Sequence, residues 1–287
     1  GYDAPACAAI AKEVGCDIAL TFNAPLKYKN DSGAEIAKML GYTNVICLNA
    51  NSYINRKDLI EAEFISSGEL GTGIVFSSLE EYIKDSIVFF GERGDKIWDK
   101  NRKDVNNVFC FEDELYSNTS IIENRLKVGY ILLPLPLFGA SQWSSLHSIS
   151  NSNEMKEYSI GGNYDRPIPR RILESRGIKR ELFGQEKKGA GFNYRFDNVK
   201  RLRKRMSQHS FQYFYSFYKR DTFSGKRYMC LLSFYWKSKY YYIHHIFRLL
   251  KINLPIPKRN EIISNPGAPL SLFKWSILIM KKKYKQQ

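Results

Sequence analysis

The sequence predicts an α/β fold, a parallel sheet with helices on both faces, followed by a mainly helical and basic C-terminal region. Short, almost continuously apolar segments alternate with helix-like segments over the first 100 residues, which is typical of a covered parallel sheet. The charge also changes along the chain, because residues 1–165 hold 15 Lys and Arg against 23 Asp and Glu, whereas residues 166–287 hold 29 against 6. We therefore expect an α/β domain over 1–118 and a helical region over 119–287.

The expected elements of the first domain follow one another at short intervals. In chain order we expect a helix over about 4–14, a strand over 16–22, a helix ending near Gly41, a strand over 44–49, a helix over 77–85 and a strand over 86–90. Asp3 stands at the N-cap position of the first helix, and Pro5 lies in its first turn, where a missing N–H is harmless. Candidate caps for the later helices are Asp31 or Ser32, and Ser77 or Ser78.

From about residue 119 the pattern turns helical. We expect helices ending at Gly129 and Gly177, long helices over 197–219 and 228–251, and a last helix that starts near Pro269. Basic and aromatic residues interleave in the two long helices. This mixture suits packed helices whose lysines point outward, and it also suits RNA or an anionic lipid-linked ligand.

The bulk composition is that of a globular protein, with 44% hydrophobic and 25% charged residues and a net charge of +15. The cysteines form no CxxC pair and stand in apolar runs, which indicates reduced, buried thiols; they are Cys7, Cys16, Cys47, Cys110 and Cys230. The longest apolar run, residues 128–140, is too short and too rich in proline to span a bilayer. These features predict a cytoplasmic protein with no transmembrane segment.

A candidate ligand site follows the strand at 86–90. Gly91 and Gly94 allow the backbone to approach a ligand closely, and Glu92 and Asp95 place two carboxylates at the carboxyl end of that strand, where open parallel sheets bind ligands. Mg²⁺ prefers carboxylate oxygens and retains substrate phosphates as ligands. Asp3, at the start of the first helix, and Asp95 are therefore predicted to hold magnesium beside a phosphate.

Four segments in this order carry a resemblance to a known family. "GYDA" resembles the end of the SGGxDS loop of PP-loop ATP pyrophosphatases, and "FFGERGDKIW" is similar to the SGEGxDELF segment of asparagine synthetases. "ENRLKVGYILLPL" resembles the E-R-x-P-F-L-D region of that family, and residues 164–192 resemble its lysine-containing stretch. The resemblance covers roughly residues 1–192 and implies a PP-loop domain of the HUP, adenine nucleotide alpha hydrolase-like class. It also implies that the first strand and the head of the loop precede Gly1.

The resemblance implies roles for individual residues. Gly1 would face the pyrophosphate of ATP, Asp3 and Asp95 would bind Mg²⁺, and the backbone at Gly91 and Gly94 would approach the nucleotide. Catalytic roles fall to Glu92 and to either Lys187 or Lys188, which the alignment does not separate. The sequence departs from the family pattern at Ala4 in the phosphate loop and at Phe90, Arg93 and Lys96.

Three arginines form a second focus. Arg166, Arg170 and Arg171 lie near the predicted start of a helix, where guanidinium groups suit a substrate carboxylate or phosphate. The alternative is that they neutralise the acidic first domain.

The function implied by the resemblance is an ATP-dependent adenylating ligase or amidotransferase. An acceptor carboxylate or carbonyl oxygen is adenylated with release of pyrophosphate, and a nitrogen nucleophile then displaces AMP. The acceptor is a small molecule or a sugar, and ammonia comes from a glutaminase partner, from solution or from another amine. The alternatives are a tRNA-modifying PP-loop enzyme, which the basic half favours, and a degenerate nucleotide-binding protein without catalysis.

Overall fold

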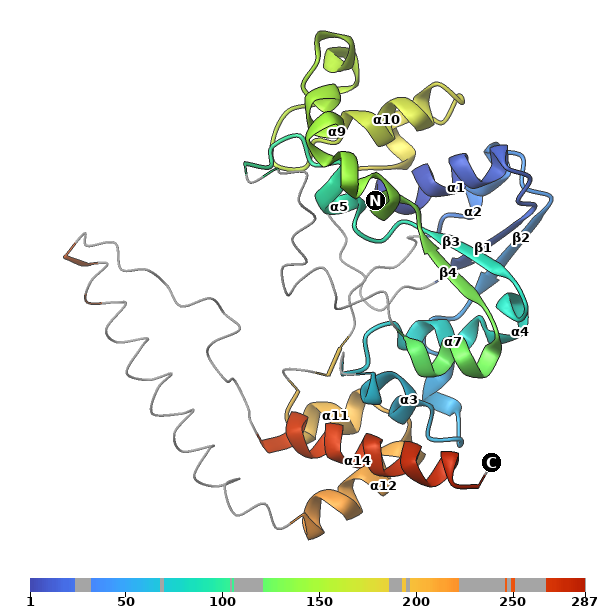
Figure 1. Ribbon diagram of the computed structural model, residues 1–287, viewed down its shortest axis with the longest axis vertical. Coiled ribbons are helices and arrows are strands. Elements are labelled where there is room, and N and C mark those ends of the chain that lie inside the picture. Colours follow the sequence, from blue (N-terminus) through green and yellow to red (C-terminus); the bar gives the residue numbers. More distant parts are fainter. Residues whose placement is uncertain are drawn as a thin grey trace. The chain divides into compact units, whose positions relative to one another are not determined.

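The computed structural model describes residues 1–23, 32–67, 70–103, 105, 121–185, 193–194, 197–221, 246, 249–250 and 267–286. The chain divides into two compact units, drawn in Figure 1. Unit 1 comprises Gly1–Ser52 and Val75–Gly191, and unit 2 comprises Tyr53–Ile74 and Phe192–Gln287. This division differs from the expected division after residue 118, because 121–185 belongs with the strands and 53–74 belongs with the C-terminal helices.

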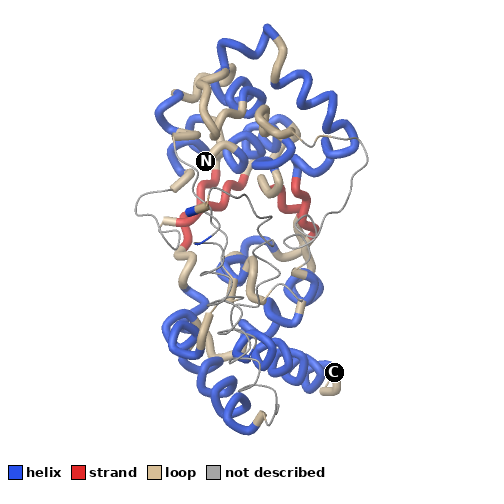
Figure 2. Tube along the Cα trace, turned by 90° about the vertical axis from the view of Figure 1, so that its left-hand side faces the viewer, coloured by secondary structure: helices blue, strands red, loops and turns tan. Residues whose placement is uncertain are grey.

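Unit 1 contains two parallel pairs of strands, drawn in red in Figure 2. Strand β1 (Ile18–Phe22) pairs with β2 (Asn44–Leu48), with Ile18 opposite Asn44 and Phe22 opposite Leu48. Strand β3 (Ile87–Phe90) pairs with β4 (Ile131–Pro134). The expected parallel α/β class is confirmed, but the described residues form two small sheets rather than the extended sheet that we expected.

Strand β4 lies in the region that the sequence predicted to be mainly helical. Its four residues follow α7 (Ile122–Val128), which ends as predicted at Gly129 with a positive φ of 80°. An apolar run of this length has too few residues for its periodicity to distinguish a strand from a helix. The pairing with β3 decides the conformation, and only the folded chain supplies that partner.

Helix α1 (Asp3–Glu13) is alanine-rich, and its buried small residues pack close to β3 and to α10 (Pro167–Glu174). Two clusters of buried side chains lie on either side of it. One consists of Tyr2, Ala9, Ile36, Leu173, Ile178 and Phe183, and the other of Ala6, Cys7, Ile97, Trp98, Ala140 and Trp143. The helix thus forms the centre of unit 1, and its first turn lies where β3 ends (Figure 1).

The remaining helices of unit 1 are short. They are α2 (Ala34–Met39), α4 (Glu80–Ile83), α5 (Gly94–Ile97), α8 (Leu135–Phe138) and α9 (Trp143–Ser150), with 3-10 turns η2 (Ile74–Ser78), η3 (Gly139–Gln142), η4 (Asn153–Tyr158) and η5 (Arg180–Leu182). The predicted helix over 77–85 is wrong in extent, because η2 occupies its start and neither Ser77 nor Ser78 caps α4. Ser32 accepts a hydrogen bond from the N–H of Ala34 (3.2 Å), but it does not cap α2, because Gly33 is the N-cap residue and has no side chain to do so. Asp31 lies outside the described residues.

Unit 2 is helical where it is described. Helix α3 (Ile60–Ser66), preceded by turn η1 (Ser52–Asn55), is buried on all sides and packs on α14 (Gly267–Tyr284) and α12 (Gln208–Arg220). The single helix expected over 197–219 is wrong. It divides into α11 (Val199–Arg205) and α12, because Ser207 starts a new helix and its side chain accepts a hydrogen bond from the N–H of Ser210. Most of the helix expected over 228–251 lies outside the described residues.

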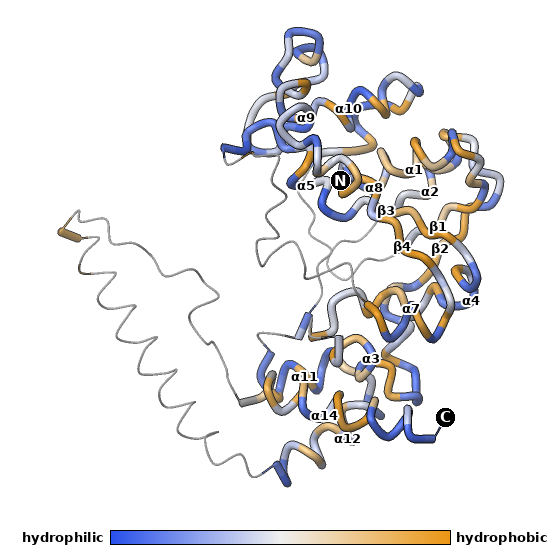
Figure 3. The backbone as a smooth tube through the Cα atoms, in the orientation of Figure 1, coloured by the Kyte–Doolittle hydropathy of each residue, from blue (hydrophilic) through white to orange (hydrophobic). Residues whose placement is uncertain are grey.

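Hydropathy differs between the structural elements. In Figure 3 the strands of unit 1 are largely orange, whereas the C-terminal end of α14 is blue. Among the described helices, none has both the length and the apolar content that a membrane span requires.

Candidate functional site

The candidate site lies where the first turn of α1 meets the end of β3. A Cβ atom on Gly91 would lie 2.5 Å from the backbone nitrogen of Ala4, and one on Gly94 would lie 2.7 Å from Oδ1 of Asp3. Both distances are too short for a real side chain, so the two glycines are what allows α1 to approach this turn. The structure thereby brings together Asp3, Ala4, Gly91 and Gly94, as the sequence predicted.

Asp3 does not cap α1, and the expectation of an N-cap was wrong. Asp3 is the first residue of the helix, and Tyr2 is its N-cap residue. The N-cap side chain makes no capping hydrogen bond to the backbone of the first turn. The Asp3 carboxylate instead lies against Gly94. Its charge also reaches Cys7 one turn further on, where burial first and Asp3 second raise the pKa of the thiol to about 12. Cys7 is thus a buried, unreactive thiol as expected, whereas Cys47 is exposed, contrary to the prediction.

Arg93 stands between the two glycines in a left-handed conformation, with φ of 71°. Only 7% of its side chain is exposed, and its Nε atom lies 4.0 Å from Oε1 of Glu92. Its Nε and Nη2 atoms make no hydrogen bond within the described part of the chain. A left-handed backbone is strained for any residue with a Cβ atom. The family segment that this turn resembles has glycine here, which adopts that conformation without strain.

Arg166 reaches the same turn from the start of α10. Its Nη2 atom donates a hydrogen bond to the backbone oxygen of Asp95 (2.9 Å), and its guanidinium carbon lies 4.6 Å from the centre of the Tyr164 ring. The side chain is 3% exposed, and its Nε and Nη1 atoms lack a hydrogen-bond partner among the described residues. The structure therefore places Arg166, a predicted substrate residue, next to the predicted metal ligand Asp95.

Tyr164 connects these groups electrostatically. Burial raises the pKa of its hydroxyl, the charge of Arg166 opposes that shift, and the charge of Asp3 adds to it. Asp3 and Arg166 thus both lie within electrostatic reach of one phenol. The Tyr164 hydroxyl also lies 3.4 Å from where a Cβ atom on Gly1 would be, so Gly1 belongs to the same cluster.

The other two predicted arginines are differently placed. Arg170 is buried, donates hydrogen bonds to the Tyr2 hydroxyl and to Glu174 (3.3 Å), and so ties α10 to the start of α1. Burial alone would raise the pKa of Glu174, but hydrogen bonds from Arg180 and Arg170 outweigh burial and lower it. Arg171 is 42% exposed and pairs with Glu154 at 2.5 Å. Arg170 therefore fastens elements together, and Arg171 lies on the surface away from the glycine turn.

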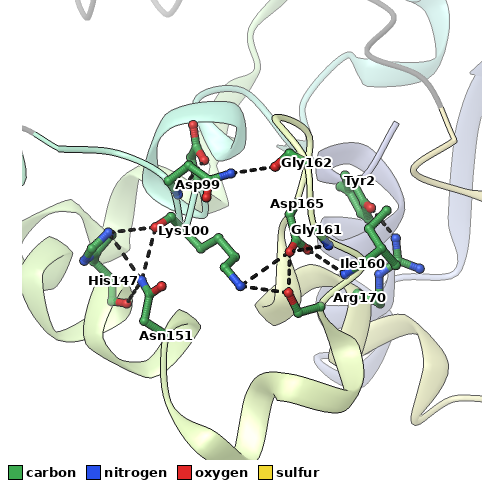
Figure 4. A network of polar contacts seen from close by, with 12 residues as sticks. Tyr2, Asp99, Lys100, His147, Asn151, Ile160, Gly161, Gly162, Asp165 and Arg170 are labelled. Atoms are coloured by element: carbon green, nitrogen blue, oxygen red, sulfur yellow. Dashed lines mark hydrogen bonds and ion pairs between the residues drawn. The ribbon is translucent and has the colours of Figure 1, made fainter.

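A polar network that the sequence did not reveal holds the segment preceding Arg166 (Figure 4). Asp165 is 1% exposed and accepts hydrogen bonds from the hydroxyl of Ser159 and from the N–H groups of Ile160 (3.2 Å) and Gly161 (2.9 Å). Lys100 Nζ lies 3.5 Å from the same carboxylate. Although burial opposes it, these hydrogen bonds and this cation lower the pKa of Asp165. In the sequence, the Gly161–Gly162 pair before Tyr164 is the local sign of a turn at this position.

Lys100 connects that network to α9. Its backbone oxygen accepts hydrogen bonds from Nε2 of His147 (3.0 Å) and from the Asn151 amide (3.1 Å), and Asn101 donates to the backbone oxygen of Gly162 (2.8 Å). The segment after α5, the turn before Arg166 and α9 are thus joined. This network orients Arg166 toward Asp95.

Lys187 and Lys188 lie outside the described residues. Within the ranges that the structure describes, no group of three or more His, Cys, Asp or Glu side chains forms a metal site. Asp3 and Asp95 would therefore hold Mg²⁺ only with phosphate oxygens and water as further ligands, which is the usual situation for this ion.

Comparison of this chain with family models, with curated proteins and with solved structures found no match. The candidate site is therefore defined by its own geometry. It consists of Gly1, Asp3, Gly91, Arg93, Gly94, Asp95, Tyr164 and Arg166.

Proposed function

We propose that the protein is an ATP-dependent adenylating ligase or amidotransferase of the asparagine synthetase type, with a PP-loop domain in unit 1. The observation that carries the proposal is a pair of buried guanidinium groups, those of Arg93 and Arg166, at the glycine turn after β3. Within the described residues, each has two nitrogen atoms without a hydrogen-bond partner. A multiply charged oxyanion is the ligand that would satisfy both.

The physical reason is the cost of burying charge. A guanidinium removed from water is strongly destabilising unless anions or acceptors occupy its N–H groups. Arginine forms paired hydrogen bonds with phosphate oxygens, and these bonds are stronger than those between neutral groups. Arg93 belongs to the turn, two residues before Asp95, and Arg166 bonds to the Asp95 oxygen, so both arginines belong to or contact the same short segment. The phosphates of a nucleotide fit this arrangement of charge.

The neighbouring carboxylates complete the proposed site. Asp3 and Asp95 would bind Mg²⁺, and the ion would supply charge neutralisation for the phosphates. The glycine turn would let backbone N–H groups approach the pyrophosphate, and Gly1 and Ala4 would lie at the start of α1, where the partial positive charge of a helix favours anions.

The proposed reaction has two steps. An acceptor carboxylate or carbonyl oxygen forms a bond to the α-phosphorus of ATP while the bond to pyrophosphate breaks. A nitrogen nucleophile then attacks the activated carbon, and AMP leaves with the bonding electrons. Arg93 and Arg166 would hold the departing pyrophosphate. Glu92 would organise the adenylate chemistry, and Lys187 or Lys188 would offset charge on the phosphates and on the developing intermediate. Positioning and charge stabilisation are the main contributions of a protein to such a transfer.

We further propose a small molecule or a sugar as the acceptor, a glutaminase partner or free ammonia as the nitrogen source, and the cytoplasm as the compartment. The acceptor and the nitrogen source follow from the resemblance, and the compartment follows from the cysteine usage and from the short length of the longest apolar run.

The deciding experiment measures release of AMP and pyrophosphate from Mg-ATP by the full-length protein, together with Mg-ATP binding by calorimetry. Asp3→Asn and Asp95→Asn should each abolish release. Asp17→Asn is the matched control, because Asp17 is 60% exposed and pairs with Lys12 outside the glycine turn. Binding without release, in the presence of candidate carboxylate and sugar acceptors, would favour a nucleotide-binding protein without catalysis. No binding of Mg-ATP by the unmodified chain would overturn the proposal.

A further inference from the structure

Most of the carboxylates in the described residues of unit 2 point inward. Five carboxylates lie in its described residues, and each is engaged. Glu61 accepts hydrogen bonds from Ser207 and Ser210, Glu63 pairs with Lys283, Asp197 with Arg205, Asp58 with Arg56, and Asp221 accepts from Ser271. Asp58 is the one exposed carboxylate among them.

The exposed ionic groups of the same unit are almost all cations. Within its described residues they are Lys57, Lys200, Arg201, Arg203, Lys204, Lys219, Arg220, Lys281, Lys282 and Lys285. Because the acids are paired internally or buried, little neutralises these side chains at the surface. Unit 2 therefore presents a positive potential that attracts polyanions at low and moderate salt.

Helix α14 adds an apolar component to this surface. Its inner side is buried through residues such as Leu272, Trp275 and Met280. Its outer side exposes Leu270 (39%), Ile277 (42%) and Leu278 (45%), which lie seven and eight residues apart along the helix. Lys281 and Lys285 continue the same side, since residues three or four apart are neighbours on a helix. The outer side of α14 thus combines aliphatic side chains with lysines, and the lysines lie at the blue end seen in Figure 3.

Tyr213 and Tyr215, the exposed rings of α12, each already contact a neighbouring side chain. Tyr215 stacks on Phe211 at 5.5 Å, and Lys219 lies over its ring at 4.6 Å. Tyr213 contacts His209 at 4.9 Å. Binding of single strands relies on accessible aromatic faces, whereas binding to an anionic bilayer relies on basic and aliphatic side chains on one helix face.

We propose that unit 2 binds the surface of a bilayer containing anionic lipids, with the outer side of α14 inserted at the headgroup level. The lysines contact lipid phosphates and carboxylates, and Leu270, Ile277 and Leu278 enter the acyl boundary. This inference is independent of the nucleotide site in unit 1.

The test is co-sedimentation of the full chain with vesicles of phosphatidylcholine plus phosphatidylserine and with vesicles of phosphatidylcholine alone. The unmodified protein should sediment with the anionic vesicles, and added salt should weaken its binding. Two double variants, Ile277→Gln with Leu278→Gln and Lys281→Glu with Lys285→Glu, should each weaken binding by about ten-fold or more. Because these side chains are exposed, circular dichroism and thermal unfolding should show that both variants fold.

Matched controls come from unit 1. Leu126 is 73% exposed and Lys84 is exposed, so Leu126→Gln and Lys84→Glu make single changes of the same two chemical kinds in unit 1 and should leave binding unchanged. Failure of the unmodified protein to bind anionic vesicles would overturn the proposal. So would binding of a labelled oligouridylate that depends on Lys281 and Lys285 but not on Ile277 and Leu278, since it would identify a nucleic-acid surface. A dimer that the Ile277→Gln, Leu278→Gln variant dissociates would likewise assign this face to a second copy.

Discussion

The guanidinium of Arg166 donates a hydrogen bond to the backbone oxygen of Asp95 at 2.9 Å, across 71 residues of sequence. This bond links the start of α10 to the turn after β3 and brings a buried cation to the predicted metal ligand. The Asp165 network directly before Arg166 restrains the segment that makes the bond. The site is thus organised by a cation whose position depends on its neighbour in sequence.

Replacement of Arg166 by lysine should weaken Mg-ATP binding by about ten-fold or more. Lysine keeps the charge but loses the planar group that bonds to the Asp95 oxygen and to a phosphate simultaneously, and lost charge-assisted hydrogen bonds are worth about 1.5–3 kcal/mol. Isothermal calorimetry measures the change. Arg171→Lys is the control, because Arg171 pairs with Glu154 at the surface; equal losses in both variants would argue against a specific role for Arg166.

Replacement of Arg93 by glycine should change stability and affinity in opposite directions. Glycine relieves the left-handed strain, which is worth about 1 kcal/mol, while the loss of the guanidinium should weaken Mg-ATP binding. Urea unfolding and calorimetry on the same preparation separate the two effects. Asp85 also has a positive φ, of 53°, so Asp85→Gly should stabilise the protein and leave binding intact. An Arg93→Gly protein with unchanged affinity would remove Arg93 from the proposed site.

Gly94→Ala should destabilise the protein by about 1–3 kcal/mol and abolish any pyrophosphate release. The new Cβ atom would lie 2.7 Å from the Asp3 carboxylate and 2.8 Å from the Trp98 ring, so the first turn of α1 must shift, as in other overpacked sites. Gly33→Ala is the matched change, since its Cβ atom would lie 3.4 Å from Thr21 Oγ1. Chemical denaturation of the two variants should differ clearly, and equal stability would contradict the close approach.

Glu61→Ala should destabilise unit 2 by about 2–4 kcal/mol. The fully buried carboxylate accepts hydrogen bonds from the backbone N–H and hydroxyl of Ser207 and from the hydroxyl of Ser210, at the start of α12. Its removal leaves buried donors without an acceptor, and unsatisfied buried donors are strongly destabilising. Glu61→Gln retains one acceptor oxygen and should lose less. The measurement is urea unfolding followed by a probe in unit 2, and equal losses would show that the hydrogen bonds matter little.

Acidification should destabilise unit 1 through Asp165. Its pKa is lower in the folded protein than the ordinary value of 3.8, so the folded state binds fewer protons than the unfolded state in this range. The stabilisation is therefore present above pH 3.8 and is lost as the pH falls below it. Asp165→Asn should be less stable at neutral pH and should show a flatter dependence of unfolding free energy on pH between about 4 and 2. An unchanged slope would exclude Asp165 as a source of acid sensitivity.

Local patterns predicted the start of the site well. The signals there are short-range, because each can be recognised from a few neighbouring residues. They are the apolar runs of β1, β2 and β3, the alanines of α1, and the glycines at 91 and 94. The sequence therefore indicated correctly that Asp3 lies against the turn after β3. It also indicated Gly129 as the end of α7.

The remainder depends on contacts between distant segments. Four apolar residues became β4 only because β3 supplies its hydrogen bonds. Nothing local distinguishes Arg166, directed to Asp95, from Arg170, which bonds to Tyr2. Helix α3 carries Glu61 and Glu63 in an otherwise apolar segment, and their partners lie far away in sequence, at Ser207 before α12 and at Lys283 on α14.

The two parallel pairs also have consequences for handling the protein. In each pair, the outer edge of either strand bonds to no other strand among the described residues. The side chains on these strands are largely apolar. Such edges accept any extended backbone that reaches them. Preparations should therefore associate increasingly with concentration and warming, and a short β-strand peptide added in excess should compete with that self-association.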